Sequence, residues 1–173
     1  MSTFSEHAAP FGAYFSSLAQ ISGALVGLVF VALTFNIKSL GLRGRPELRD
    51  LARQTFADFL TVLVLSLTLL LPGLSADAAG YVLIALALVA LLRVLRGLYG
   101  AVTRTADARA RGQIVQRFLL SLMGNSGVLC TGVIALRGMV DSDALWSLLA
   151  SSPMVLLISG SRSAWMLVVH SDD

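Results

Sequence analysis

The sequence predicts an all-α fold, a polytopic membrane helical bundle with about five transmembrane helices, and three observations predict it. The first is composition, because 56% of the 173 residues are hydrophobic and 13% are charged, whereas soluble domains carry roughly 45–50% and roughly 25%. The second is a series of apolar runs of membrane-spanning length. The third is the placement of the basic residues, nearly all at one end of the predicted bundle. Together they predict a single transmembrane domain over residues 1–173.

A helix needs about 20 residues to cross about 30 Å of hydrocarbon, and the first two runs reach or approach this length. The first predicted span covers residues 13–37, which is too long for a signal-peptide core of about 7–15 residues. The second covers residues 55–72, on a helix that begins at Pro46, since proline fits the first turn of a helix. Pro72 and Gly73 then end that helix.

The third predicted span covers residues 79–99, and its short connection to the second makes these two helices an antiparallel hairpin. The fourth covers residues 117–137 and the fifth covers residues 144–162. Pro153 lies in the middle of the fifth span, and proline is tolerated in a membrane helix where neighbouring groups satisfy the freed carbonyl. We therefore predict a kinked fifth helix, with four crossings plus a re-entrant or interfacial segment as the alternative.

The basic residues predict the orientation of the bundle. If each run crosses once, Arg137 lies at one end and the other 12 of the 13 Lys and Arg residues lie at or near the opposite end. Basic residues resist translocation, so the arginine-rich end is predicted to be cytoplasmic, with the N-terminus outside and the C-terminus inside. Because these arginines flank apolar runs, we expect the lipid bilayer as partner and no nucleic acid.

Asp58 is the one carboxylate that falls inside a predicted span, about one turn into the second. An ionisable group at membrane depth is costly and is a functional-site hypothesis by default. Arg93 and Arg96 of the third helix fall at comparable depth, so we predict an intramembrane ion pair of Asp58 with Arg93 or Arg96. Three interpretations remain open: a structural ion pair between two helices, a role in ion passage or proton relay, and a carboxylate that reaches the headgroups.

Arginines recur at steps of three and four residues along the third helix, which places them on one face. They are either side chains that extend to the membrane interface or ligands for anions and lipid headgroups. Four arginines are predicted to contact an anion or the headgroup of an anionic lipid: Arg96, Arg104, Arg117 and Arg162.

Small and polar residues follow helical spacing on the first and fourth spans. Gly23 and Gly27 form a GxxxG motif, which promotes close helix packing in lipid. Polar side chains at membrane depth need hydrogen-bond partners, which a neighbouring helix, a second subunit or a water-filled pore would supply. The candidates for pore lining or polar helix packing are Ser16, Gln20, Gly23, Gly27, Thr34, Asn36, Ser121, Asn125 and Thr131.

These residues support two functional hypotheses. In the first, the protein is a small homo-oligomeric channel or channel-like ion permeation protein, because a shared aqueous axis accommodates polar groups that a small bundle cannot enclose. In the second, it is a non-conducting membrane scaffold or modulator that binds another membrane protein or anionic lipid. We expect no enzyme activity, since Asp58 lacks a second cooperating catalyst. We expect no metal or other cofactor, since His7 and His170 lie at opposite ends of the chain.

The stretch from Ser22 to Asn36, SGALVGLVFVALTFN, resembles the first helix of a family of small, uncharacterised bacterial multi-pass inner-membrane proteins. In that family an Ala/Gly-rich start leads to a Gly-Leu-Val-Phe-Val-Ala centre and a polar end. The resemblance extends through the arginine-rich loop and the Leu-rich second helix to Pro72. It implies a protein of the bacterial cytoplasmic (inner) membrane. It implies no activity and supplies no site residues.

Overall fold

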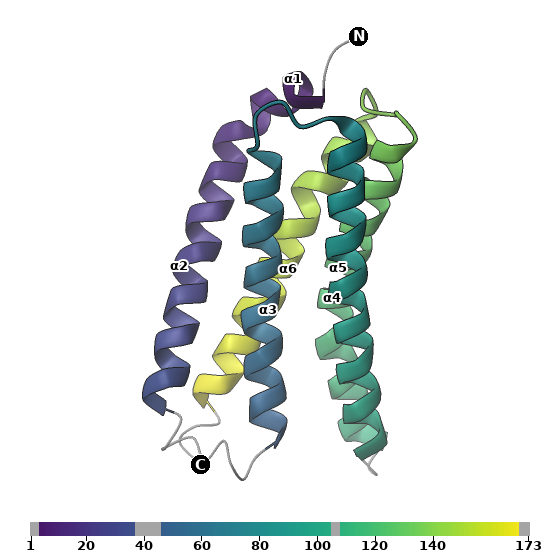
Figure 1. Ribbon diagram of the computed structural model, residues 1–173. Coiled ribbons are helices and arrows are strands. Elements are labelled where there is room, and N and C mark those ends of the chain that lie inside the picture. Colours follow the sequence, from purple (N-terminus) through teal and green to yellow (C-terminus); the bar gives the residue numbers. More distant parts are fainter. Residues whose placement is uncertain (1–3, 37–45, 105–107, 170–173) are drawn as a thin grey trace.

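The computed structural model describes residues 4–36, 46–104 and 108–169, which form helices and turns without any strand. The elements in chain order are α1 (Phe4–Ala8), the 3-10 helix η1 (Ala9–Phe11), α2 (Gly12–Asn36), α3 (Pro46–Leu69), α4 (Ala76–Arg104), α5 (Ala108–Leu136) and α6 (Asp143–Val169). The axes of helices α2 to α5 are roughly aligned, and α6 is inclined to them (Figure 1). Helices that follow one another in the chain point in opposite directions. The prediction of an all-α bundle is confirmed.

Five of these helices are long and apolar enough to cross a membrane, which indicates a multi-pass membrane protein. The candidate spans are Ala9–Thr34, Ala52–Leu69, Ala76–Gly100, Phe118–Leu136 and Asp143–Trp165. The fifth span, for which the sequence left a re-entrant segment open, belongs to one continuous helix that passes through Pro153. Beside this proline, the Ser152 hydroxyl donates to the Leu148 carbonyl at 2.6 Å.

Helix α3 is the centre of the bundle and α2 lies at its periphery. Of the α3 span, 67% of the residues are buried, against 11% of the α2 span. Helix α3 packs mainly on α2 and α6, whereas α4 packs mainly on α5. The predicted hairpin of α3 and α4 is therefore present as a chain connection, but the contact between these two helices is limited, and they diverge from one another (Figure 1).

Glycines allow the closest helix approaches, and these fall on α4, α5 and α6. A Cβ added to Gly132 would lie 2.8 Å from Ile84 Cγ1 and 3.1 Å from the carbonyl oxygen of Gly80. By contrast, a Cβ added to Gly27 of the GxxxG motif on α2 would meet no atom of another helix within 4 Å, and a Cβ on Gly23 would meet Leu63 at an ordinary 3.7 Å. The motif that the sequence singled out thus forms no close helix contact within the described part of the chain.

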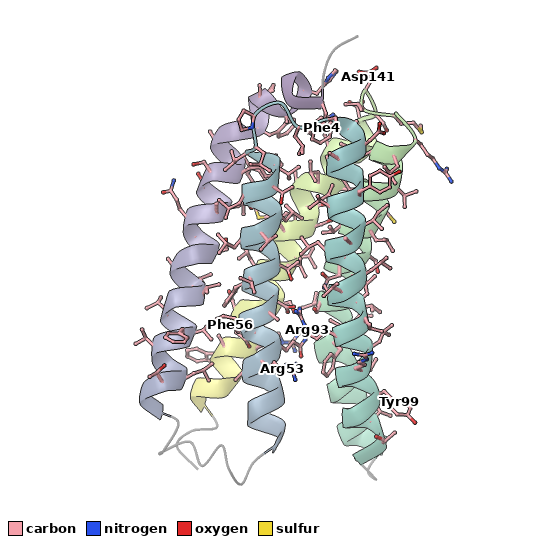
Figure 2. The ribbon with its side chains drawn as sticks, in the orientation of Figure 1. Phe4, Arg53, Phe56, Arg93, Tyr99 and Asp141 are labelled. Atoms are coloured by element: carbon pink, nitrogen blue, oxygen red, sulfur yellow. The ribbon has the colours of Figure 1, made fainter. Side chains whose placement is uncertain are left out.

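The N-terminal segment folds over one end of the bundle, which we call the N-terminal end. Trp146 of α6 stacks on Phe11, with ring centroids 5.1 Å apart, and on Phe4, at 5.5 Å. His7 Nε2 lies 2.8 Å from Asp141 Oδ1. Figure 2 shows Phe4 and Asp141 at this end. The sequence analysis did not predict α1, because a helix of five residues is too short to show periodicity.

The opposite end is defined by the start of α3 and the end of α4 (Figure 1). We call it the basic end, since Arg53, Arg96 and Arg162 are exposed near it. Arg137 is exposed near the N-terminal end. Lys38, Arg43 and Arg45 of the loop before α3 lie outside the described residues.

We expect Gly132→Ala to lower stability by about 1–3 kcal/mol, because the new methyl group would press on backbone atoms that cannot move away. Gly27→Ala is the matched control, since its methyl group enters open space, and it should leave stability unchanged. Thermal unfolding of both variants in the same detergent measures the difference. Equal melting temperatures would contradict the close approach of α4 and α5.

Candidate functional site

Asp58 of α3 lies at a point where four helices contribute side chains, and it is completely buried (0% exposed). Its Oδ1 accepts a hydrogen bond from Ser121 Oγ of α5 at 2.9 Å, and its Oδ2 accepts one from Ser159 Oγ of α6 at 3.1 Å. Arg93 Nη2 of α4 lies 4.0 Å from Oδ1. The carboxylate therefore has two hydroxyl donors and one cation, which stands too far away for a hydrogen bond.

The sequence left two arginines as partners of Asp58, and the structure brings Arg93 to it. Arg96 lies three residues further along α4, about 60° short of a full helical turn, and its side chain is exposed. Within the described residues, Arg96 forms no ion pair. The choice between the two arginines depends on how α4 is rotated against α3.

Asn125 extends the polar cluster of Asp58 by one helical turn. It is completely buried, and its Nδ2 donates to the Ser121 carbonyl oxygen at 2.7 Å. Its Oδ1 has no hydrogen-bond partner. Ser121 is thus held from one side by Asn125 and donates on the other side to Asp58, so the cluster orients the carboxylate.

A pocket of about 550 Å³ lies beside this cluster, between α3 and α4, and α5 contributes one wall. Figure 2 shows the side chains of Arg53 and Arg93 in the space between α3 and α4. More of the pocket wall is apolar than polar. The lining residues are Arg53 and Gln54 of α3, Val89, Leu92, Arg93, Val94, Arg96, Gly97 and Gly100 of α4, and Phe118 of α5.

Two hydrogen-bond donors of the lining residues have no acceptor. Gln54 is 7% exposed, and its Nε2 is buried without a hydrogen-bond partner. Arg93 Nη2 is likewise buried without one. Buried polar groups are almost always hydrogen-bonded, so each exception calls for an explanation. Both residues line the pocket, so the two unmet donors belong to side chains of its wall.

The charge around the pocket is positive. Arg53, Arg93 and Arg96 all line it, so three guanidinium groups surround one pocket. No Asp or Glu is found among the described residues that line the pocket. Asp58 faces Arg93 at 4.0 Å. Among the described side chains, three cations against this one carboxylate leave a surplus of two positive charges, which an anion would neutralise.

The other candidates from the sequence fall in two groups. On α5, Thr131 is buried, and its hydroxyl donates to the Gly127 carbonyl within the same helix at 2.9 Å. On α2, Gln20 and Thr34 are exposed; Gln20 Nε2 donates to Ser16 Oγ at 3.3 Å, and Thr34 Oγ1 donates to the Phe30 carbonyl at 2.8 Å. The structure therefore brings the α5 residues into the bundle and leaves the α2 residues at its surface.

The predicted headgroup arginines do not all fall at the pocket. Arg96 lines it. Arg162 is exposed on α6 and is not among the lining residues. The side chains of Arg104, Arg117 and Asn36 lie outside the described part of the structure.

Sequence reasoning missed three residues of the site: Arg53, Gln54 and Ser159. Gln54 stands four residues before Asp58, one helical turn away on the same face, which is a signal that points to it. Ser159 belongs to a buried set with Ser152 and Ser163, whose spacing of seven and four residues is that of one helix face. Arg53 carried no such signal, because its role depends on the separation of α3 from α4.

In the described residues, no group of three or more His, Cys, Asp or Glu side chains is arranged to hold a metal ion. Comparisons of the chain with protein-family models, with curated proteins and with solved structures find no match. The functional assignment therefore rests on the chemistry of the site.

We expect Asp58→Asn to destabilise the bundle by about 1–3 kcal/mol, because the amide cannot accept both hydroxyl bonds and Arg93 loses its counter-charge. Asp77→Asn is the control, since Asp77 is exposed in the first turn of α4 and should change stability by less than about 0.5 kcal/mol.

Thermal unfolding in detergent, combined with Ser159→Ala in a double-mutant cycle, checks this expectation. The effects of Asp58→Asn and Ser159→Ala should be non-additive, because the two side chains share one hydrogen bond. Additive effects, or an unchanged melting temperature for Asp58→Asn, would refute the structural role of the carboxylate.

Proposed function

We propose that this protein is a multi-pass protein of the bacterial cytoplasmic membrane that binds an anion in the α3–α4 pocket and acts as a non-conducting scaffold or modulator. One observation carries this proposal: Arg53, Arg93 and Arg96 line one pocket without any carboxylate among its described lining residues, and two of the lining residues, Gln54 and Arg93, have a buried donor without an acceptor. The second hypothesis of the sequence analysis, a non-conducting scaffold or modulator that binds another membrane protein or anionic lipid, is favoured over permeation because Ser121, Asn125 and Thr131 of α5 are enclosed within the bundle.

The energetics of the donors support an anionic ligand. Leaving a buried donor without an acceptor costs about 1–3 kcal/mol, and gathering three like-charged guanidinium groups around one pocket is also unfavourable. Charge-assisted hydrogen bonds to carboxylate or phosphate oxygens are about twice as strong as neutral ones. Guanidinium groups are suited to these oxygens because their planar donors match the geometry of phosphate. An anion in the pocket would offset both costs.

The proposed orientation follows from the distribution of arginine. Arg53, Arg96 and Arg162 are exposed towards the basic end, and Arg137 is exposed near the N-terminal end. Since basic residues resist translocation, we propose that the basic end faces the cytoplasm and that the N-terminus lies outside. The pocket then opens at the depth of the cytoplasmic leaflet, where basic pockets between helices bind anionic groups.

A second candidate is the homo-oligomeric channel. The exposed face of α2 favours it. Only 11% of the α2 span is buried, Gln20 and Thr34 are exposed, and a Cβ added to Gly27 would meet nothing within 4 Å. A ring of α2 helices from several subunits would cover this face and surround an axis with its polar groups. Flux separates the two candidates, since a scaffold in liposomes should give no ion leak, whereas an ion-selective leak would favour the channel.

We expect Arg53→Gln and Arg96→Gln each to weaken the binding of inorganic phosphate by about tenfold, because each removes a charge-assisted contact. Arg137→Gln is the matched control at the other end of the bundle and should bind phosphate as the unaltered protein does. Isothermal titration calorimetry of the full chain in a neutral detergent measures the affinities.

A phosphate affinity that is the same in all three variants would overturn the proposed pocket. Weaker binding in Arg137→Gln to the same degree would show a general charge effect and would also count against it.

A further inference from the structure

The α3–α4 pocket has an apolar part and a cationic part that follow one another along α4. Val89 and Leu92 line the pocket and are 67% and 50% exposed. Arg93 and Arg96 follow them towards the basic end, and Arg96 lies about 10 Å beyond Val89 at the helical rise of 1.5 Å per residue. A free phosphate ion uses only the cationic part. A molecule with an apolar tail and an anionic head uses both parts in the order in which the helix presents them.

The apolar part of the pocket is open to the outside of the bundle. Val89 and Leu92 are exposed residues on a helix that is apolar enough to cross a membrane, so in a bilayer they contact acyl chains. The pocket therefore communicates with the hydrocarbon and not only with the aqueous phase. A lipid of the adjacent leaflet can reach the arginines by sideways movement, with its tails still among the other lipids.

The charge surplus selects among anionic headgroups. Arg53, Arg93 and Arg96 line the pocket, and Asp58 compensates one of them, at 4.0 Å from Arg93. Among the described side chains at the pocket, two positive charges are left without a counter-charge. A phosphodiester carries one negative charge, whereas a phosphomonoester carries about 1.5 to 2 at neutral pH and offers three acceptor oxygens. Arg53 and Arg96 have guanidinium donors for these oxygens, and Gln54 and Arg93, which also line the pocket, each have a buried donor without an acceptor.

The pocket has room for a headgroup beside the arginines. Gly100 lines the pocket, and a Cβ added to it would have no atom within 4 Å. Gly97 also lines the pocket, but a Cβ added to it would lie 3.2 Å from Phe118 Cε1, so Phe118 fills the space beside it. The open space next to Arg96 is thus the space at Gly100.

From this charge, this apolar wall and these unpaired donors, we infer that the ligand of the pocket is a lipid phosphomonoester of the adjacent leaflet. Its phosphate is held by Arg53, Arg93, Arg96 and Gln54, and its acyl chain lies on Val89 and Leu92. The inference rests on the proposed anion-binding function and names the class of its ligand.

The test uses the full chain in nanodiscs of zwitterionic phosphatidylcholine that contain a small fraction of one probe lipid. Phosphatidate is the phosphomonoester probe and phosphatidylglycerol is the phosphodiester probe. Native mass spectrometry counts the lipid retained by the protein. We expect phosphatidate to be retained at least about tenfold more than phosphatidylglycerol, as one additional charge-assisted contact would give.

Two variants connect this retention to the pocket. Arg96→Gln should lower phosphatidate retention about tenfold by loss of one phosphate contact. Gly100→Leu should lower it by filling the headgroup space, and it should leave the fold intact because the new side chain enters open space. Gly27→Leu is the matched control, since it adds the same side chain to open space on α2 and should retain phosphatidate normally. Circular dichroism and thermal unfolding verify that each variant is folded.

The outcomes separate the two proposals. Equal retention of phosphatidate and phosphatidylglycerol would overturn the phosphomonoester inference. If inorganic phosphate binds as tightly as phosphatidate in a manner sensitive to Arg96→Gln, the lipid inference fails and the anion-binding function stands. If neither phosphate nor any lipid responds to Arg96→Gln and Gly100→Leu, both proposals fail together.

Discussion

The buried carboxylate of Asp58 is the constraint on which the arrangement of the inner helices depends. Burying an ionised side chain away from water costs free energy unless the side chain is hydrogen-bonded and paired with an opposite charge. Asp58 meets this requirement by drawing on three other helices, through Arg93 of α4, Ser121 of α5 and Ser159 of α6. Because each partner comes from a different helix, the rotation of all four helices about their axes is specified by one side chain.

The same cluster explains why α3 and α4 diverge. Arg93 faces Asp58, but it also lines one pocket with Arg53 of α3 and with Arg96, three residues further along α4. One carboxylate does not balance three guanidinium groups, so α3 and α4 do not close on one another at this level. Helix α4 instead makes its extensive contact with α5, where Gly80 and Gly132 permit close approach. The pocket is thus a consequence of charge excess on one side and small residues on the other.

Much of the site was predictable from composition and spacing, and the remainder was not. Asp58 and the choice of Arg93 or Arg96 followed from a charged residue in an apolar run and from the lengths of two helices. Ser121 and Asn125 could be named as candidates because they are polar side chains in the middle of an apolar span. Gln54 and Ser159 were within reach of the periodicity of their helices. Arg53 was not, because an arginine near a helix start has the same pattern whether it faces a pocket, a lipid headgroup or water.

The sequence by itself determined the all-α fold and the five apolar helices, because the cost of leaving backbone groups unpaired in lipid admits few alternatives to a helix of membrane-spanning length. Only the tertiary structure decided which faces of those helices meet. Glycines at helical spacing occur on α2, which makes no close approach, and on α5, which does. Arg93 and Arg96 are three residues apart on α4, yet only Arg93 faces Asp58. The local sequence pattern is therefore the same for contacting and non-contacting faces. Rotation of each helix, set by the partners of Asp58 and by the close glycine approaches, selects among them.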